Sequence, residues 1–217
     1  MSFKSTDIAA ARRHLRRSDP VLRGLIDRVG PFTLKVQRDR FNMLVRSIVS
    51  QQISTAAARS IRLRLEGLVA PDRLTPANLA ALTAAQLRSA GISPQKAGYL
   101  IDLADRVASG HTRLARIGRL DDEEIIEELT AIRGVGRWTA QMFLIFCLGR
   151  LDIFPHGDFG VRKAIRDLYG LAHMPDKAAS YEIAAPWRPY ASIASWYCWR
   201  SLDLPTTKPA KAKSYPC

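Results

Sequence analysis

Apolar residues recur at intervals of three and four along almost the whole chain, whereas the alternation that is typical of β-strands is scarce. This spacing predicts an all-α protein made of many short helices. Prolines, glycines and capping side chains at the ends of the apolar segments place helices at residues 20–29, 40–50, 55–68, 76–82, 84–90, 94–109, 137–148, 158–169 and 186–202. Two more helices are expected to begin at the acidic residues 121–124 and after the capping residue Asp176.

The charge balance narrows the class of partner. The 33 Lys and Arg residues outnumber the 20 Asp and Glu residues and give a formal net charge of +13. Such a charge indicates an anionic partner, and nucleic acid is favoured over a membrane surface. The longest apolar run, Met142–Leu148, is far shorter than the roughly 18 residues of a membrane span. The N-terminus lacks an apolar signal-peptide core, so an intracellular protein is expected, cytoplasmic in a bacterium or nuclear in a eukaryote.

The cysteines indicate neither a disulfide framework nor a metal centre. Cys147, Cys198 and Cys217 are too few and too scattered for a set of disulfides or a closed zinc site. Cys147 lies within an apolar segment and is expected to be a buried, inert thiol. The last residues, 206–217, are rich in Lys and Pro and poor in apolar side chains, which predicts a basic flexible tail.

Residues 129–140, LTAIRGVGRWTA, have the most specific pattern in the chain. They predict a helix, a tight turn in which Gly134 and Gly136 permit positive φ and close approach, and a second helix from Arg137. A helix start offers unpaired N–H groups at the positive end of its dipole. The amides from Gly134 to Arg137, with Val135 as an apolar plug, are therefore expected to hold a phosphate, as in a helix-hairpin-helix. Two glycines alone would more often form a plain turn.

Residues 129–165, LTAIRGVGRWTAQMFLIFCLGRLDIFPHGDFGVRKAI, resemble the helix-hairpin-helix DNA glycosylases. Within that superfamily they are most similar to the 3-methyladenine DNA glycosylase II branch. The resemblance extends to residues 45–54 and 186–200, so it covers most of residues 20–202. Arg133 is one departure, because the family usually has proline at this position, and it is expected to alter the rigidity of the turn while leaving its amides available.

The resemblance implies two helical lobes with a lesion cleft between them. The central lobe would comprise residues 37–150 and carry the hairpin. The other lobe would be formed by residues 1–36 together with residues 151–205.

Asp158 corresponds to the catalytic carboxylate of the family. Cleavage of an N-glycosidic bond leaves positive charge on the sugar, and a nearby carboxylate stabilises that charge and can orient the attacking water. Phe159 and nearby apolar residues are expected to lower the local dielectric, which would strengthen the effect. Without the resemblance, an aspartate near a helix start is usually an N-cap, and the two roles are compatible.

Trp138 stands where bifunctional members carry the lysine that attacks the sugar, so a monofunctional enzyme is expected. The four clustered cysteines of the iron–sulfur members are missing, so no iron–sulfur cluster is expected. In the resembling enzymes the positions of Trp138 and Trp196 line the base pocket, although a generic tryptophan more often packs in a core. An indole attracts a cationic, alkylated base by about 0.5–2 kcal/mol. Gln52 corresponds to a residue that wedges into the duplex, although glutamines at a helix junction normally mean little.

These features predict a monofunctional DNA glycosylase of base excision repair. It would flip alkylated purines, of the 3-methyladenine and 7-methylguanine type, out of double-stranded DNA and hydrolyse the N-glycosidic bond, leaving an abasic site. A glycosylase for another purine lesion, such as hypoxanthine or ethenoadenine, and a noncatalytic DNA-binding protein are the alternatives. A monomer without a required cofactor or a membrane is expected. The resemblance also implies a monovalent cation, Na⁺ or K⁺, at the backbone carbonyls of Thr130, Ile132 and Val135.

Overall fold

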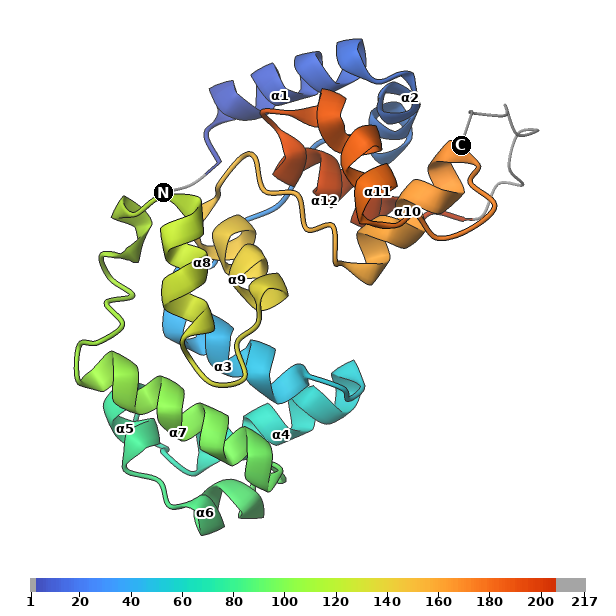
Figure 1. The fold of residues 1–217 in the computed structure, drawn as a ribbon. Helices are drawn as coiled ribbons and strands as arrows, with labels where there is room; N and C mark the ends of the chain where they lie inside the picture. The colour runs from blue at the N-terminus through green and yellow to red at the C-terminus, as the bar shows by residue number, and fades with distance from the viewer. Residues whose placement is uncertain (1–2, 206–217) are drawn as a thin grey trace. The chain divides into compact units, whose positions relative to one another are not determined.

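The structure is a computed structural model that describes residues 3–205, and Figure 1 shows its fold. Every regular element in this range is helical and none is a β-strand, which confirms the all-α prediction. The predicted basic tail, 206–217, lies outside the described residues. The α-helices are α1 (Ser5–Ser18), α2 (Pro20–Val29), α3 (Arg40–Ser50), α4 (Thr55–Gly67), α5 (Pro76–Ala80), α6 (Ala84–Ser89), α7 (Pro94–Ala108), α8 (Asp122–Thr130), α9 (Arg137–Phe143), α10 (Phe159–Tyr169), α11 (Lys177–Ala184) and α12 (Ala191–Ser201).

Side-chain caps begin most of these helices where the sequence predicts them. Asp121 and Glu124 form a capping box at the start of α8, and Asp176 accepts the Ala179 N–H at the start of α11. The bounds of α4 to α7 agree with the prediction to within two residues. The prediction lacked α1, because Lys4 at its N-cap offers no side-chain hydrogen bond that a capping signal would reveal.

The last predicted helix, 186–202, is shorter in the structure. Residues Ala185–Trp187 form a single 3₁₀ turn, and the α-helix starts only at Ala191. Pro189 lies between the two. Because proline has no N–H to donate and its ring clashes with the preceding turn, a continuous helix through this position is unfavourable.

The chain divides into two compact units. Unit 1 consists of Met1–Val36 and Leu148–Cys217, and unit 2 of Gln37–Cys147. Unit 1 thus contains the blue and orange ends of the coloured chain in Figure 1, and unit 2 contains the cyan to yellow part between them. The second boundary lies three residues before the predicted one at 150/151. No helix of the described residues has the length and apolar character needed to cross a membrane.

Unit 1 is built on α1, α2, α10 and α12, which pack around one apolar core. Its fully buried side chains include Leu15, Leu22, Ile26, Ile165, Trp187 and Tyr197. The burial of these large side chains is the main favourable term for folding this unit.

The buried carboxylate of Asp19 joins three elements of unit 1. Its Oδ1 caps α2 by accepting the N–H groups of Val21 and Leu22, at 2.8 and 3.0 Å. Its Oδ2 accepts the indole N–H of Trp187 at 2.9 Å and the hydroxyl of Tyr169. Burial and the neighbouring charge of Asp19 raise the pKa of Tyr169, so its hydroxyl stays a donor. Four donors therefore satisfy a carboxylate that would otherwise be costly to bury.

Unit 2 surrounds α3, whose buried side chains contact α4, α7 and α9. The N–H of Gln37 donates to the carbonyl of Phe146 at 2.7 Å and joins the two ends of the unit. The predicted helix 137–148 is α9 followed by a π-helical segment, Leu144–Leu148. Cys147 in this segment is buried, and burial raises the pKa of its thiol to about 12, which confirms the expected inert thiol.

Replacing Asp19 by alanine tests its role in unit 1. Asp19→Ala removes an N-cap and leaves a buried indole N–H and a buried hydroxyl without their acceptor, so we expect the free energy of unfolding to fall by about 2–4 kcal/mol. Urea denaturation measures the loss. The matched control is Asp27→Ala, which breaks only an exposed ion pair with Arg16 and should cost less than about 1 kcal/mol. Equal losses in the two variants would contradict the role assigned to Asp19.

Candidate functional site

Asp158 lies at the N-cap of α10, immediately after the loop 151–157. Its side chain is nearly buried, with 8% of the residue surface exposed. Oδ1 accepts the backbone N–H of Val161 at 2.8 Å and the indole N–H of Trp199 at 2.8 Å. The capping role considered for this residue is therefore confirmed. The carboxylate is held in one orientation by a donor from its own helix and a donor from α12.

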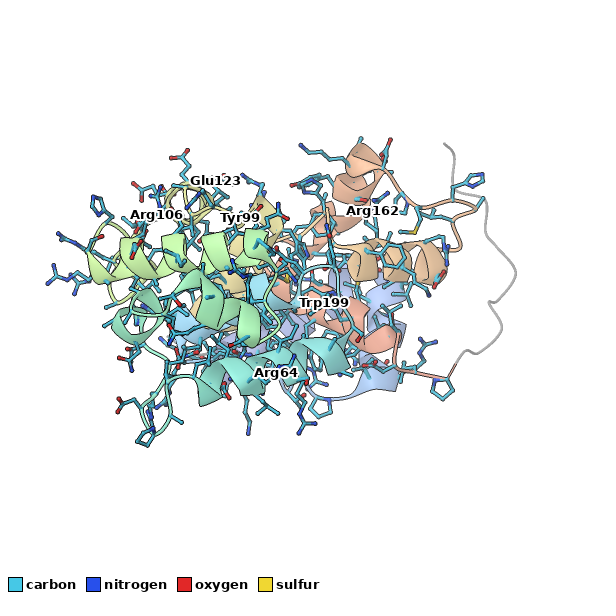
Figure 2. All side chains as sticks on the ribbon, turned by 90° about the horizontal axis from the view of Figure 1, so that it is seen from below. Arg64, Tyr99, Arg106, Glu123, Arg162 and Trp199 are labelled. Carbon is cyan, nitrogen blue, oxygen red and sulfur yellow. The ribbon has the colours of Figure 1, made fainter. Side chains whose placement is uncertain are left out.

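Trp199 is a residue that the sequence analysis missed. Its indole reaches Asp158 because α10 and α12 pack against each other, and Figure 2 labels Trp199 on α12 and Arg162 on α10. Gly160 leaves the space for this contact, since a Cβ there would lie 3.1 Å from Trp199 Cδ1 and 3.2 Å from Asp158 Oδ1. A glycine in the first turn of a helix is an intrinsically unfavourable choice. That unexplained glycine was the signal in the sequence that could have indicated a close contact.

Trp196 is buried in unit 1, with 7% of its surface exposed. Its ring packs edge-on against Phe32 and Tyr197, with centroids 4.8 and 4.9 Å apart. This placement matches the core alternative that holds for most tryptophans. Its role in a base pocket stays a prediction.

Aromatic side chains surround the loop that leads into Asp158. The hydroxyl of Tyr181 lies 3.1 Å from His156 Nδ1, and its ring packs edge-on against Phe154 at a centroid distance of 5.2 Å. Phe159, however, is 70% exposed. The expectation that Phe159 lowers the dielectric around Asp158 is therefore wrong for this structure, because the first residue of α10 points its side chain away from the core.

In unit 2, the segment between α8 and α9 forms the predicted hairpin. Gly134 has the expected positive φ of 81°. A Cβ at Gly134 would lie 2.1 Å from the ring of Tyr99, so the close approach that this glycine permits is to a side chain of α7. Gly136 is different from the prediction: its φ is −93° and its ψ is 172°. It is the extended N-cap of α9, a conformation that any residue adopts.

Some backbone N–H groups of the hairpin form hydrogen bonds within the described part of the protein, and others do not. The N–H of Val135 donates to the carbonyl of Ile132 at 3.1 Å, so this amide is used inside the turn, contrary to the expectation that it faces a phosphate. The Val135 side chain is buried, as expected of an apolar plug. Within residues 3–205, the N–H groups of Gly134 and Gly136 have no acceptor. The guanidinium of Arg137 pairs with Glu123 of α8 at 2.6 Å.

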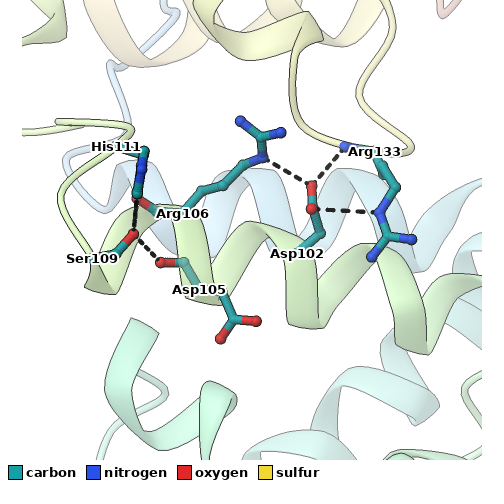
Figure 3. Close-up of polar contacts among 6 residues, drawn as sticks. All are labelled: Asp102, Asp105, Arg106, Ser109, His111 and Arg133. Carbon is teal, nitrogen blue, oxygen red and sulfur yellow. Dashed lines mark hydrogen bonds and ion pairs between the residues drawn. The ribbon is translucent and has the colours of Figure 1, made fainter.

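Asp102 of α7 holds the first residue of the turn, as Figure 3 shows. Its Oδ2 accepts the backbone N–H of Arg133 at 2.9 Å and the Nε–H of Arg106 at 3.2 Å, while Oδ1 lies 3.4 Å from Arg133 Nε. Proline, the usual residue of the resembling family at position 133, could not donate this hydrogen bond. In this chain the hydrogen bond to Asp102 holds the backbone of the turn at Arg133. In the resembling family the ring of proline would stiffen the turn at this position instead.

The loop between α3 and α4, which contains Gln52, is attached to the same face of α7. Gln52 is the non-glycine residue with positive φ, 56°, among residues 3–205, and it is exposed after the end of α3. Its neighbour Gln51 donates through Nε2 to the Gly134 carbonyl at 2.8 Å. Lys96 donates to the carbonyls of Val49 and Gln51 at 2.8 and 2.6 Å, and burial lowers the pKa of its ammonium group. The loop of Gln52 and the hairpin are therefore joined directly and through α7.

Trp138 is the second residue of α9, and 46% of its surface is exposed. The next residues of the helix, Thr139 and Ala140, are buried. Trp138 is therefore not a core tryptophan. Its indole lies on the surface of unit 2, at the N-terminal end of α9.

Comparison with known proteins identifies the family of this chain. Residues 45–189 match the family model described as HhH-GPD superfamily base excision DNA repair protein. The chain belongs to this superfamily. The match covers more than half of the chain and includes Gln52, the hairpin, Trp138 and Asp158.

Relatives within the HhH-GPD superfamily agree with the predicted branch. The chain is 31% identical to DNA-3-methyladenine glycosylase 1 of Schizosaccharomyces pombe over 97% of this chain and 95% of that protein. It is 29% identical to DNA-3-methyladenine glycosylase 2 of Escherichia coli over 73% of this chain and 57% of that protein. A structure of the Schizosaccharomyces pombe 3-methyladenine DNA glycosylase in complex with abasic DNA superimposes with a TM-score of 0.82, at 30% identity, over 90% of this chain and 97% of that one. These relatives support the class of DNA glycosylases, hydrolases that act on the N-glycosyl bond.

The two hairpin glycines of this superfamily member should respond differently to the same substitution. Gly134→Ser should lower the free energy of unfolding by about 2–4 kcal/mol, because the new side chain strains a positive-φ residue and collides with Tyr99. Gly136→Ser should change it by less than about 0.5 kcal/mol, because serine is a favoured N-cap and a Cβ there meets no atom within 4 Å. Urea denaturation followed by circular dichroism compares the two. A loss of similar size at Gly136 would mean that its environment is as crowded as that of Gly134.

Proposed function

We propose that this chain is a monofunctional DNA glycosylase that removes alkylated purines from double-stranded DNA, with Asp158 as the catalytic carboxylate. The observation that carries the proposal is the placement of Asp158. A nearly buried aspartate is held at a helix start by a backbone and an indole donor, and the resemblance to the DNA glycosylases assigns the catalytic carboxylate to this residue.

The proposed reaction uses the negative charge of Asp158. As the bond between C1′ of the sugar and the base nitrogen breaks, the bonding electron pair leaves with the base and positive charge develops on the sugar. The carboxylate stabilises this charge and orients the water that then attacks C1′. A base alkylated at N3 or N7 carries a positive charge and departs as a neutral molecule, so no strong general acid is needed.

Trp138 supports both the substrate class and the monofunctional chemistry. Its exposed indole offers a face that attracts a cationic base, by about 0.5–2 kcal/mol according to its desolvation. An indole has no amine that could form a Schiff base with the sugar. Selection of the charged base rests mainly on Trp138, because Trp196 packs in the core of unit 1.

The DNA backbone is the proposed ligand of the hairpin. The N–H groups of Gly134 and Gly136 and the start of α9 can face a phosphate, and the formal net charge of +13 favours binding to DNA. Gln52, exposed in a strained backbone conformation, is the proposed wedge that fills the space left by an extruded nucleotide. The enzyme would act as a monomer wherever the cell keeps its DNA.

The hairpin carbonyls fit a monovalent cation. Within residues 3–205, the carbonyls of Thr130 and Val135 accept no hydrogen bond, and that of Ile132 accepts one, from Val135. Carbonyl oxygens are suitable ligands for a hard cation. Such an ion would stiffen the turn, and no step of the reaction depends on it.

Substitution of Asp158 tests the central role. Asp158→Asn should lower the single-turnover rate of base release by more than tenfold, equivalent to about 1.4 kcal/mol, because it removes the charge that stabilises the sugar cation. The measurement is chromatography of the bases released from a methylated duplex. The matched control is Asp176→Asn at the N-cap of α11. Since asparagine caps a helix as well as aspartate does, this control should keep the wild-type rate. An Asp158→Asn rate above a tenth of wild type would contradict the assignment.

The product should be an abasic strand without a nick. Trp138 cannot form a Schiff base, so borohydride should trap no covalent adduct between protein and DNA, and the strand should break only after alkali treatment. A bifunctional glycosylase serves as the positive control for trapping. A trapped adduct, or cleavage products before alkali, would show that the enzyme has lyase activity.

A further inference from the structure

Two buried aspartates in unit 1 each accept an indole N–H, but in different settings. Asp19 receives Trp187 Nε1 at 2.9 Å within the core of the unit, where donors also engage its other oxygen. Asp158 receives Trp199 Nε1 at 2.8 Å on the same oxygen, Oδ1, that caps α10. The first arrangement is explained by the packing of the unit. The second involves the carboxylate to which the proposed function assigns the chemistry.

The Trp199 hydrogen bond has a defined physical effect on Asp158. The backbone cap holds Oδ1 through the Val161 N–H, a donor that belongs to the same helix. A second donor from α12, which lies 41 residues further along the chain, adds an independent direction and limits rotation of the carboxylate. Both donors bind the same carboxylate oxygen, and hydrogen bonds to a charged oxygen are stronger than those between neutral groups.

Gly160 leaves room for the hydrogen bond between Trp199 and Asp158. Gly160 lies opposite the pair, and a Cβ there would come within 3.1 Å of Trp199 Cδ1 and 3.2 Å of Asp158 Oδ1. Such distances are tighter than ordinary van der Waals contact, so either the indole or the carboxylate would have to move. Glycine at this position therefore preserves the hydrogen bond, although glycine is an unfavourable residue in a helix.

Several ionisable groups on the elements around this contact have polar contacts of their own. On α10, Arg162 donates to the Pro175 carbonyl. On α12, Arg200 pairs with Asp203. Burial and the charges of Asp19 and Asp158 raise the pKa of the Cys198 thiol, which stays neutral. In the preceding loop, His156 contacts the Tyr181 hydroxyl.

We infer that Trp199 is a positioning residue for the glycosylase reaction: its indole N–H holds the Asp158 carboxylate in the orientation that the chemistry uses, and Gly160 provides the space for that hydrogen bond. The inference rests on the proposed function, because it acts through Asp158. It adds a residue outside the family-derived set of the hairpin, Gln52, Trp138, Trp196 and Asp158.

The experiment compares Trp199→Phe with Trp187→Phe in the full-length chain. Both variants lose one indole-to-aspartate hydrogen bond, but only the first loses it at Asp158. Single-turnover release of methylated bases is measured together with affinity for an undamaged duplex and urea denaturation. Trp199→Phe should lower the rate about tenfold, because the carboxylate has lost the donor that fixes its orientation. Its affinity for DNA should be unchanged.

Trp187→Phe should lower the stability of the fold and leave the rate unchanged at a temperature at which it is folded. Trp199→His, which restores an N–H donor, should recover part of the rate. Gly160→Ala should lower the rate in the same direction as Trp199→Phe, whereas Gly24→Ala, where a Cβ meets no atom within 4 Å, should not.

The outcomes distinguish a failure of the proposed function from a failure of the role assigned to Trp199. If the wild-type chain releases no base from methylated DNA, the proposed function fails. If the wild type is active but Trp199→Phe and Gly160→Ala keep its rate, the positioning role of Trp199 is wrong. A lower rate that is accompanied by weaker binding to the undamaged duplex would also overturn it and make Trp199 a DNA contact.

Discussion

The first turn of a helix leaves N–H groups without partners, and in α10 the Asp158 side chain satisfies one of them. This requirement places a nearly buried carboxylate at a fixed position in unit 1, where charge interacts more strongly than it does in water. The packing of α12 against α10 then brings the indole of Trp199 to the same oxygen. The demands of helix capping and of the proposed chemistry therefore overlap: both need an oxygen acceptor that is held in place, and the chemistry also uses its negative charge.

In unit 2, a single helix supports two exposed segments, the loop of Gln52 and the hairpin between α8 and α9. One face of α7 presents Lys96, Tyr99 and Asp102 at intervals of three residues, so they lie along the same side of the helix. Lys96 binds the carbonyls at the end of α3, Tyr99 packs on Gly134, and Asp102 binds the backbone of Arg133. The proposed wedge at Gln52 and the proposed phosphate-binding hairpin are both exposed, yet their backbones are supported by this single helix.

The comparison of Asp19 and Asp158 shows how one local motif serves two purposes. Each aspartate caps a helix and accepts an indole N–H in unit 1. Asp19 is fixed further by Tyr169 and lies where only protein surrounds it, so its contribution is to the stability of the fold. Asp158 stands at the position that the superfamily resemblance assigns to catalysis. The function of such a carboxylate is thus decided by what can approach it, and the capping geometry is common to both.

Local interactions explain what the sequence by itself determined. The caps at Asp19, Asp121, Asp158 and Asp176 act on amides two or three residues away, so their patterns are legible in the chain, and they set the starts of α2, α8, α10 and α11. The positive φ of Gly134 and the buried side chain of Val135 follow in the same way from the short hairpin pattern.

Contacts between distant residues were decided only by the tertiary structure. Trp199 binds Asp158 across 41 positions, and Asp102 binds Arg133 across 31. Neither pair has a spacing that a helical period could reveal, because the distance depends on how whole helices pack. The same reason explains the errors at Phe159, which is exposed, and at the N–H of Val135, which the turn uses internally. Sequence spacing determines which groups a helix presents, whereas helix packing determines which of them meet.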